Sequence, residues 1–244
     1  MVNFQIELAG FVIDINVNFE RTKNDYTAYI VEKTPDLSLT ITQEDLLFEK
    51  AKCIREDAVE GRPPRKTYGY IVESTAVQRK LAEFLFDHNT IVFHGSVVAV
   101  DGQGYLFTAK SGTGKSTHTG FWRQIFGDRA VMVNDDKPFL RITDSGVLVC
   151  GSPWNGKHGL GNNICVPLKA ICVLERGEEN EVMPVDGKEL LYFLLQQSNR
   201  PLNPQKMPKY MDLISELSGK TSFYRMKCNL DPDAARVAFE AMSK

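Results

Sequence analysis

The run from Ala109 to Thr117 constrains the fold of this chain more than any other feature. It reads Ala-Lys-Ser-Gly-Thr-Gly-Lys-Ser-Thr and ends as a phosphate-binding Walker A loop ends. Glycines let the backbone of such a loop curl, so that successive N–H groups point into one concavity and can hold phosphate oxygens. The run therefore predicts a strand that leads into the loop, a helix that leaves it, and a bound nucleotide.

The residues expected to bind the nucleotide are Ser111, Gly112, Thr113, Gly114, Lys115, Ser116 and Thr117. In a loop of this kind Lys115 reaches the β- and γ-phosphates, and the Ser116 hydroxyl binds Mg²⁺. The usual pattern opens with a glycine, where this chain has Ala109. Alanine is the smallest replacement and is tolerated where the backbone keeps a negative φ. ATP and Mg²⁺ are the expected cofactors.

The residues around the loop fit this arrangement. Residues 105–108 form a short β-type run, and residues 115–126 have the apolar spacing of a helix that Gly127 would end. Residues 91–100 predict a strand, and Asp-Gly-Gln-Gly at 101–104 predicts a hairpin turn. Two hairpin-linked strands thus lead straight into the loop, unlike the helical crossovers of Ras-like or Rossmann-like folds.

The remaining pattern indicates an α/β protein. Residues 1–88 are expected to form a β-rich N-terminal subregion with helices at 43–55 and 74–88, the second one capped by Ser74. Residues 89–244 are expected to form the core that carries the loop, with further strands at 130–134, 139–142, 147–150, 168–174, 181–185 and 222–227 and helices at 188–198, 206–217 and 232–243. Since no linker rich in Pro, Gly or Ser divides the chain, one continuous domain over 1–244 is the alternative.

Composition excludes several classes of protein. With 43% hydrophobic residues, a net charge of −2 and a pI near 6.1, the chain lacks the basic field of a nucleic-acid-binding protein. No apolar stretch approaches the ~20 residues of a membrane span, and no signal peptide precedes the first strand, so we expect a cytoplasmic protein without membrane partners. Five cysteines without C-x-x-C spacing predict neither a disulfide nor a zinc site: Cys53, Cys150, Cys165, Cys172 and Cys228.

Two neighbouring carboxylates offer the chemistry that the loop lacks. Asp135 and Asp136 follow Asn134 at the end of an apolar strand, 20 residues after Lys115. Adjacent carboxylates repel each other unless a cation lies beside them, and adjacent strand residues point to opposite faces. One aspartate is therefore expected to bind Mg²⁺ beside Ser116, and the other to face the γ-phosphate and the acceptor. The alternative is a structural turn, because Asp-Asp-Lys-Pro is also good turn chemistry.

His94 and a glycine-rich loop are further candidates. His94 interrupts the apolar run 91–100, where a core histidine and a catalytic one are equally compatible with the pattern. Residues 151–163 are rich in Gly and Asn and carry Trp154, Lys157 and His158. Such a loop could close over a ligand, with Lys157 neutralising the transferred phosphate, or it could be a surface loop with a packed tryptophan.

Three motifs in order give the chain a family resemblance. The motifs are His94-Gly95-Ser96, the loop residues 111–116, and the pair Asp135-Asp136. Over residues 94–174, roughly a third of the chain, they resemble the catalytic domain of HPr kinase/phosphorylase and, more distantly, ATP-dependent phosphoenolpyruvate carboxykinase. The resemblance implies an α/β P-loop fold of the HPr kinase C-terminal-domain and carboxykinase type, with a mixed β-sheet and flanking helices.

The resemblance also implies roles for single residues. Lys115 would hold the phosphates, Ser116 and Asp136 would bind Mg²⁺, and Asp135 would act as the base toward an acceptor hydroxyl. The two aspartates could exchange these roles. His94 would lie near the metal or the γ-phosphate.

The expected activity is ATP-dependent transfer of the γ-phosphoryl group to a hydroxyl, most simply a serine in a protein, a peptide or free form. The segment with which HPr kinases engage their partner protein has no counterpart in this chain, so the acceptor stays open, as does homo-oligomerisation. One alternative is a nucleotide-binding sensor or scaffold without transfer. A carboxykinase-like enzyme is less favoured, because such enzymes are much longer than this chain.

Overall fold

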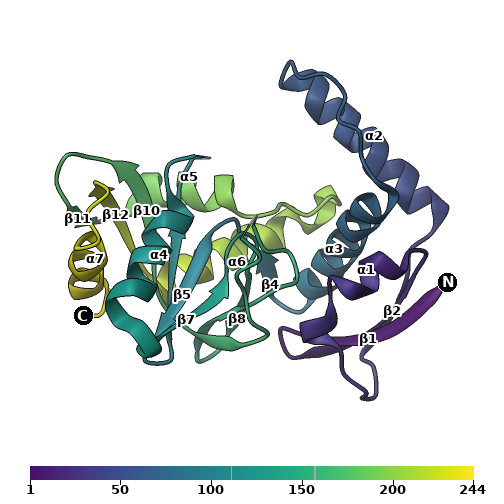
Figure 1. Cartoon of the computed structure of the whole chain (residues 1–244), viewed down its shortest axis with the longest axis horizontal. Helices are drawn as coiled ribbons and strands as arrows, with labels where there is room; N and C mark the ends of the chain where they lie inside the picture. The colour runs from purple at the N-terminus through teal and green to yellow at the C-terminus, as the bar shows by residue number, and fades with distance from the viewer. Residues whose placement is uncertain (111, 157) are drawn as a thin grey trace. The chain divides into compact units, whose positions relative to one another are not determined.

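The computed structural model describes residues 1–110, 112–156 and 158–244, which divide into two compact units (Figure 1). Unit 1 comprises Met1–Phe84 and unit 2 comprises Leu85–Lys244. Within these described ranges, no helix combines the length and the apolar character that crossing a bilayer would demand. All residues of the predicted nucleotide site belong to unit 2.

Unit 1 is a small sheet with helices. Its strands are β1 (Val2–Leu8), β2 (Phe11–Val17) and β3 (Leu37–Thr40), with β2 antiparallel to β1 and parallel to β3. Its helices are α1 (Glu20–Asn24), α2 (Gln43–Val59) and α3 (Gly69–Asp87), the last of which continues into unit 2. Alternate residues of β1 and β2, such as Ile6 and Ile13, are fully buried, as the period-two pattern predicts.

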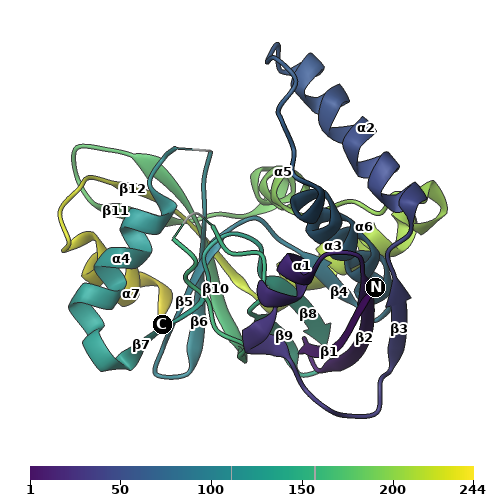
Figure 2. The ribbon, with the colours of Figure 1, turned by 45° about the vertical axis from the view of Figure 1, so that its right-hand side comes forward.

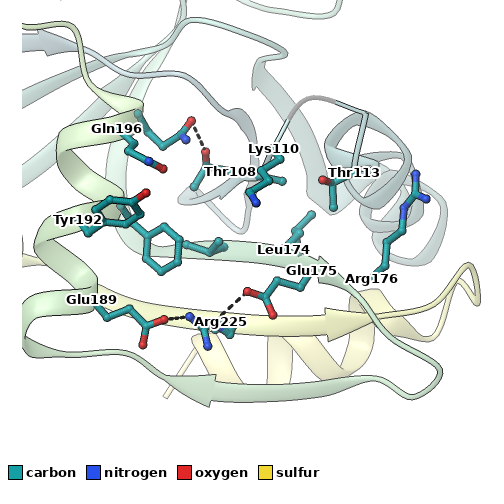
Figure 3. Close-up of a pocket in the computed structure, with 14 residues that line it drawn as sticks. Thr108, Lys110, Thr113, Leu174, Glu175, Arg176, Glu189, Tyr192, Gln196 and Arg225 are labelled. Atoms are coloured by element: carbon teal, nitrogen blue, oxygen red, sulfur yellow. Dashed lines mark hydrogen bonds and ion pairs between the residues drawn. The ribbon is translucent and has the colours of Figure 1, made fainter.

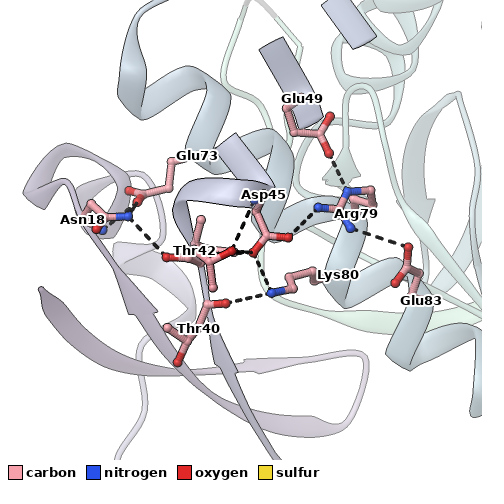
Figure 4. A network of polar contacts seen from close by, with 10 residues as sticks. Asn18, Thr40, Thr42, Asp45, Glu49, Glu73, Arg79, Lys80 and Glu83 are labelled. Atoms are coloured by element: carbon pink, nitrogen blue, oxygen red, sulfur yellow. Dashed lines mark hydrogen bonds and ion pairs between the residues drawn. The ribbon is translucent and has the colours of Figure 1, made fainter. Parts of the chain in front are cut away.

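A buried carboxylate explains where α3 begins. Glu73 is fully buried, and it accepts hydrogen bonds from the Asn18 amide (2.6 Å) and the Asn18 side chain (2.8 Å) (Figure 4). It also accepts one from the Thr22 hydroxyl (2.7 Å). Glu73 lies within α3, which already starts at Gly69. The prediction that Ser74 caps this helix is therefore wrong, because tertiary hydrogen bonding outweighs the local capping preference.

Charged side chains join α2 to α3. Arg79 donates to Asp45 (2.8 Å) and to Glu49 (2.6 Å), and Lys80 donates to Asp45 (2.7 Å) (Figure 4). Burial alone would raise the pKa of Asp45, but the hydrogen bonds from Lys80, Thr42 and Arg79 outweigh it and hold the pKa well below its usual range. Asp45 thus stays ionised and stabilises unit 1 through both basic partners.

Unit 2 is built on a mixed sheet. Its strands are β4 (Thr90–Val92), β5 (Ser96–Val100), β6 (Gln103–Thr108), β7 (Ala130–Asn134), β8 (Phe139–Thr143), β9 (Gly146–Cys150), β10 (Cys165–Arg176), β11 (Glu181–Pro184) and β12 (Ser222–Cys228). They lie in the order β4-β8-β9-β10-β6-β5-β7, with β12 beside β10 and β11 beside β12. Strand β10 runs parallel to β6 and β12, whereas the other pairings in this sheet are antiparallel. The expected α/β fold with a mixed sheet is confirmed.

Helices cover both faces of this sheet. They are α4 (Lys115–Phe126), α5 (Gly187–Gln197), α6 (Met207–Lys220) and α7 (Ala234–Met242). Helices α4 and α7 lie side by side and bury Trp122, while α5 and α6 pack around Leu194 and Tyr210 on the other face (Figures 1 and 2). Strand β5 serves both layers, because Val97 faces the α6 side and Val98 the α4 side. The central strands are therefore buried on both faces, which gives the edge that carries the loop a rigid base.

Two expectations for unit 2 are wrong. The run 91–100 is two strands, β4 and β5, because the backbone leaves the sheet at residues 93–95, where the Gly95 amide bonds to the Asp136 carbonyl (2.9 Å). The structure also joins Cys150 and Cys165 in a disulfide, where the sequence predicted none. These cysteines face each other across the antiparallel pair β9–β10, a register that sequence spacing alone does not reveal.

Candidate functional site

The loop after β6 has the backbone form that a phosphate cradle requires. Gly112 has φ 78° and Gly114 has φ 117°, conformations that side-chain-bearing residues rarely adopt, and α4 begins at Lys115. Within the part of the chain that the structure describes, no side chain caps this helix, so its first N–H groups can receive an anion. Ser111, which the sequence assigns to the same site, lies outside the described residues.

Neighbouring elements hold the loop in place. The Arg176 guanidinium, at the end of β10, donates to the Gly112 carbonyl (3.0 Å), and the Thr113 amide bonds to the Lys110 carbonyl (3.2 Å). Ala109 has no positive φ and is almost fully buried in the apolar cluster around Trp122. Its methyl group therefore fills space in the core, which explains why alanine serves where the usual pattern has glycine.

Lys115 connects the loop to the two aspartates. Its ammonium lies 3.4 Å from the Ala109 carbonyl oxygen and is half-buried. Burial lowers the pKa of Lys115, and the carboxylates of Asp136 and Asp135 act in the opposite direction without cancelling it. The ammonium therefore lies close enough to both carboxylates for their charges to act on it.

Asn134 builds the turn that presents the aspartates. It is fully buried, and its side-chain oxygen accepts from the amides of Asp136 (2.9 Å) and Lys137 (2.7 Å). Its side-chain nitrogen donates to the Ser152 carbonyl (3.0 Å) and to Asn155 Oδ1 (3.1 Å). This segment can therefore be both a structural turn and a metal site. Asn134 forms the turn, and the two aspartate side chains are left to bind a ligand.

Asp135 is buried below the edge of the sheet. It is 4% exposed, and Ser96 donates to its Oδ1 (3.0 Å). The Ser96 hydroxyl also contacts the Thr119 hydroxyl (3.0 Å), which bonds to the Lys115 carbonyl in the first turn of α4 (3.3 Å). Asp135 Oδ2 is buried and has no hydrogen-bond partner among the described residues. A chain of hydroxyl groups therefore fixes Asp135 to the phosphate loop and leaves one oxygen to be satisfied.

Asp136 has a different environment from its neighbour. Its side chain is 33% exposed, and Oδ1 lies 3.4 Å from His94 Nε2. Burial would raise the pKa of Asp136, but the hydrogen bond from His94 and the charges of Lys137 and Lys115 outweigh it, so the pKa lies below its usual value. Asp136 is therefore ionised at neutral pH and accessible to a ligand.

His94 is not a core residue. Its side chain is 42% exposed, and its Nδ1 lies 3.2 Å from Gln197 Oε1 at the end of α5. Thr108, the last residue of β6, donates to both the His94 carbonyl (2.9 Å) and Gln197 Oε1 (3.0 Å). Gly95 is required beside it, because a Cβ there would lie 2.8 Å from Leu106 Cδ2 and 2.9 Å from the Phe107 carbonyl oxygen. Helix α5 and strand β6 thus hold the ring beside Asp136.

The glycine-rich segment after β9 lies beside the aspartates. Ser152 donates to the Lys137 carbonyl (2.7 Å), and a Cβ on Gly156 would lie 3.2 Å from Asp135 Oδ2. Trp154 is partly buried and packs edge-on against Phe139, with ring centroids 6.1 Å apart. The first part of this loop is therefore a wall of the candidate site. Lys157 lies outside the described residues, so its expected role stays a prediction.

Comparisons with known proteins give a distant likeness to a solved structure and no match in sequence. No family model matches the chain, and no curated protein matches it. The solved structure of the Hpr(Ser) kinase/phosphatase from Coxiella burnetii is similar over 63% of this chain and 99% of that chain, at 16% sequence identity and a TM-score of 0.34. Likeness at this level assigns the chain to no family, and the functional conclusions below depend on the geometry of the site.

The donor groups at the two aspartates suit Mg²⁺ better than they suit a metal ion whose ligands all come from the protein. Among the described residues, no three His, Cys, Asp or Glu side chains gather where they could hold a metal ion. Mg²⁺ does not need such a cluster, because it usually takes one or two carboxylates and completes its shell with water and substrate phosphates. The unsatisfied Asp135 oxygen beside the phosphate loop fits that requirement.

Sequence reasoning missed several residues of the site. They are Thr108, Thr119, Arg176 and Gln197, together with the role of Ser96. Gln197 follows His94 by 103 positions, and only the packing of α5 brings the two together. Thr119 had a local signal, since it lies one helical turn after Lys115 on the face that turns toward β5.

Proposed function

We propose that this protein is an ATP-dependent, Mg²⁺-using kinase that transfers the γ-phosphoryl group to a hydroxyl acceptor, most simply a serine in a protein, a peptide or free form. The observation that carries the proposal is the chain of hydrogen bonds from Asp135 through Ser96 and Thr119 to the Lys115 carbonyl, which fixes an aspartate beside the helix that leaves the phosphate loop. A phosphate held by Lys115 would then face two carboxylates, as transfer to a nearby nucleophile requires.

The environments of the two aspartates favour the exchanged roles that the sequence left open. Asp136 is ionised, accessible and paired with His94, which suits a group that accepts the hydroxyl proton. Asp135 is buried, anchored by Ser96 and has a free oxygen, which suits a ligand of Mg²⁺ together with the Ser116 hydroxyl. We therefore assign proton transfer to Asp136 and metal binding to Asp135.

In the proposed step, the acceptor hydroxyl oxygen forms a bond to the γ-phosphorus while its proton passes to the Asp136 carboxylate. The bond between the γ-phosphorus and the oxygen that bridges it to the β-phosphate breaks, and ADP leaves. Lys115 and the first N–H groups of α4 stabilise the charge on the phosphate oxygens throughout. Bound Mg²⁺ would add further neutralisation of the same charge.

His94 is proposed to position Asp136. The ring is held by Gln197 on one side and contacts Asp136 on the other. This arrangement directs the carboxylate toward the site. The order of the three motifs, together with the hairpin that leads into the loop, also supports our finer proposal of a fold of the HPr kinase C-terminal-domain type.

A direct transfer assay tests the proposal. The purified protein is given Mg²⁺ and ATP labelled in the γ-phosphate, with a panel of acceptors that includes serine and serine-containing peptides. Label is expected to move to one class of hydroxyl, and Lys115→Ala is expected to weaken ATP binding and transfer together. If wild-type protein binds ATP but label never leaves it across a broad panel, the chain is a nucleotide sensor. If Lys115→Ala binds ATP as wild type does, the loop is not the nucleotide site.

A further inference from the structure

A cavity of about 510 Å³ opens directly beside the phosphate loop (Figure 3). One wall is the loop itself, with Lys110 and Thr113, and the opposite wall is α5, with Tyr192 and Phe193. The last residues of β10, from 173 to 176, form the floor. The volume lies within the range of about 300–1,000 Å³ that is typical of small-molecule sites.

Most of this cavity lies on the β10 side of the loop, and of its described lining residues only Thr108 and Gln197 reach His94, the partner of Asp136. Strand β6 leads into the loop, and β10 lies on one side of it. Strand β5 lies on the other side, followed by β7, after which the two aspartates come. A triphosphate whose γ-phosphate faces Asp135 and Asp136 therefore has its other end free to extend over the loop toward β10. The cavity occupies that position.

The lining suits a flat, uncharged ring. Tyr192 is 60% exposed, and its ring lies 6.2 Å from that of Phe193, so the helix presents two aromatic side chains to the cavity. Gln196 offers an amide that can both donate and accept hydrogen bonds (Figure 3).

The charged groups of the cavity are largely paired with one another. Arg225 of β12 contacts Glu175 (3.3 Å between Nε and Oε1) and also pairs with Glu189 (Figure 3). Arg176 donates to the loop at Gly112. These pairs leave the aromatic end of the cavity without a strong net charge, whereas Lys110 adds a positive charge at the loop, where phosphates would lie.

We propose that this cavity is the nucleobase subsite, in which the purine ring of the nucleotide stacks on Tyr192, with Phe193 edge-on beside it, and is read by Gln196. The inference rests on the proposed nucleotide-binding function but does not require phosphoryl transfer. It places the acceptor on the other side of the loop, at His94 and Asp136.

Binding of ATP and of inorganic tripolyphosphate, each with Mg²⁺, tests the subsite by calorimetry. Wild-type protein should bind ATP more tightly than tripolyphosphate. Tyr192→Ala should weaken ATP binding by about 3–10-fold, the contribution typical of one aromatic contact. Gln196→Trp, which fills the cavity from an exposed helix position, should weaken it further. Both variants should bind tripolyphosphate as wild type does, and Leu191→Ala, an exposed neighbour that does not line the cavity, should change neither ligand.

Three results would overturn the subsite. They are equal affinity of wild type for ATP and tripolyphosphate, wild-type ATP affinity in Gln196→Trp, and loss of transfer with unchanged ATP affinity in both cavity variants, which would make the cavity an acceptor site. Failure of the proposed function looks different. In that case wild type binds neither ligand, or it discriminates ATP from tripolyphosphate but transfers nothing, and the second outcome leaves the base subsite standing.

Discussion

Two adjacent residues of the same type have different environments in this site. Asp135 is enclosed by Ser96 and the first turn of α4, whereas Asp136 faces His94 and is a third exposed. The turn formed by Asn134 separates them, because it binds the amides of Asp136 and Lys137 at the end of β7. Position in the fold, and not residue type, therefore decides which carboxylate can meet the acceptor.

Substituting each aspartate separately should give different kinetic defects. Asp136→Asn removes the proton acceptor, so kcat should fall by about 10²–10⁴-fold while ATP still binds. Asp135→Asn removes a charged oxygen beside the phosphate loop, so the main effect should be a higher Mg²⁺ concentration for half-maximal rate. Steady-state rates over a Mg²⁺ titration separate the two. Asp128→Asn, an exposed acid after α4, controls for loss of one charge.

The opposite pattern would assign proton transfer to Asp135 and metal binding to Asp136. In that case Asp135→Asn would slow transfer even at saturating Mg²⁺, and Asp136→Asn would mainly shift the Mg²⁺ requirement. Unchanged turnover in both variants would remove both from the chemistry.

At the residue scale, the sequence predicted the site residues that belong to one local motif. It missed those that come from distant parts of the chain and meet only in the folded protein. The two glycines of the loop have the backbone conformations that the motif requires, because the reason for them is local. Gln197 and Arg176 reach the site only through the packing of α5 and β10. The sequence left His94 equally compatible with a core and a catalytic histidine, because it does not show that the chain leaves the sheet at this residue.

At the scale of elements, the hairpin β5–β6 positions the phosphate loop, and the break between β4 and β5 positions His94. Both strands are buried on both faces, so their sequences read as continuous apolar runs that carry no mark of the break at 93–95. Gly95 lies in this break, where an added Cβ would be too close to Leu106 and to the Phe107 carbonyl oxygen.

A pair of glycine variants tests the importance of this contact. Gly95→Ala must move β6 backbone as well as Leu106, so it should destabilise unit 2 by about 1–3 kcal/mol and slow transfer through His94. Gly120→Ala lies within α4 with nothing near its Cβ position, so it should stabilise by up to about 1 kcal/mol. Urea unfolding followed by tryptophan fluorescence measures both, since Trp122 and Trp154 belong to unit 2. Equal stability of the two variants would contradict the close contact.

Elements with strong local signals were predicted closely. Helix α4 and strand β7 begin and end where the pattern placed them, because a glycine, a loop motif and an apolar run mark their ends. Helix α3 starts earlier than predicted, since the buried bonds of Glu73 to Asn18 and Thr22 come from distant parts of the chain. Local capping preference carries no information about such bonds.

The charged network of unit 1 predicts a pH dependence. The pKa of Asp45 is depressed in the folded protein, so its stabilising contribution is present above the unfolded value near 3.9 and is lost as the pH falls below it. Asp45→Asn should therefore destabilise unit 1 by about 1–3 kcal/mol at pH 7 and progressively less below about pH 4. Protection of the α3 amides against hydrogen exchange, corrected for intrinsic rates, measures this. Glu44→Gln, an exposed neighbour, should show no such convergence.

At the scale of the whole molecule, the candidate chemistry is confined to one of the two units. Every side chain placed at the phosphate loop, the aspartates or the neighbouring cavity lies between residues 94 and 225, within unit 2. The polar network around Asp45 and Glu73 lies within unit 1. Perturbations of the two units can therefore be followed separately, by tryptophan fluorescence for unit 2 and by amide exchange in α2 for unit 1.

The disulfide between Cys150 and Cys165 gives such a perturbation. It closes the segment that carries Ser152 and Asn155, the partners of the Asn134 turn. Closing a loop of this length restricts the unfolded chain by about 3 kcal/mol, so reduction, or the double variant Cys150→Ala with Cys165→Ala, should lower the stability of unit 2 by roughly that amount. Protection of the α2 amides in unit 1 should not change.

Peptide mapping without reduction should find this cross-link, with Cys53, Cys172 and Cys228 as free thiols. Alkylation of all five cysteines before reduction would contradict the bond, and equal loss of stability in both units would contradict their separate response.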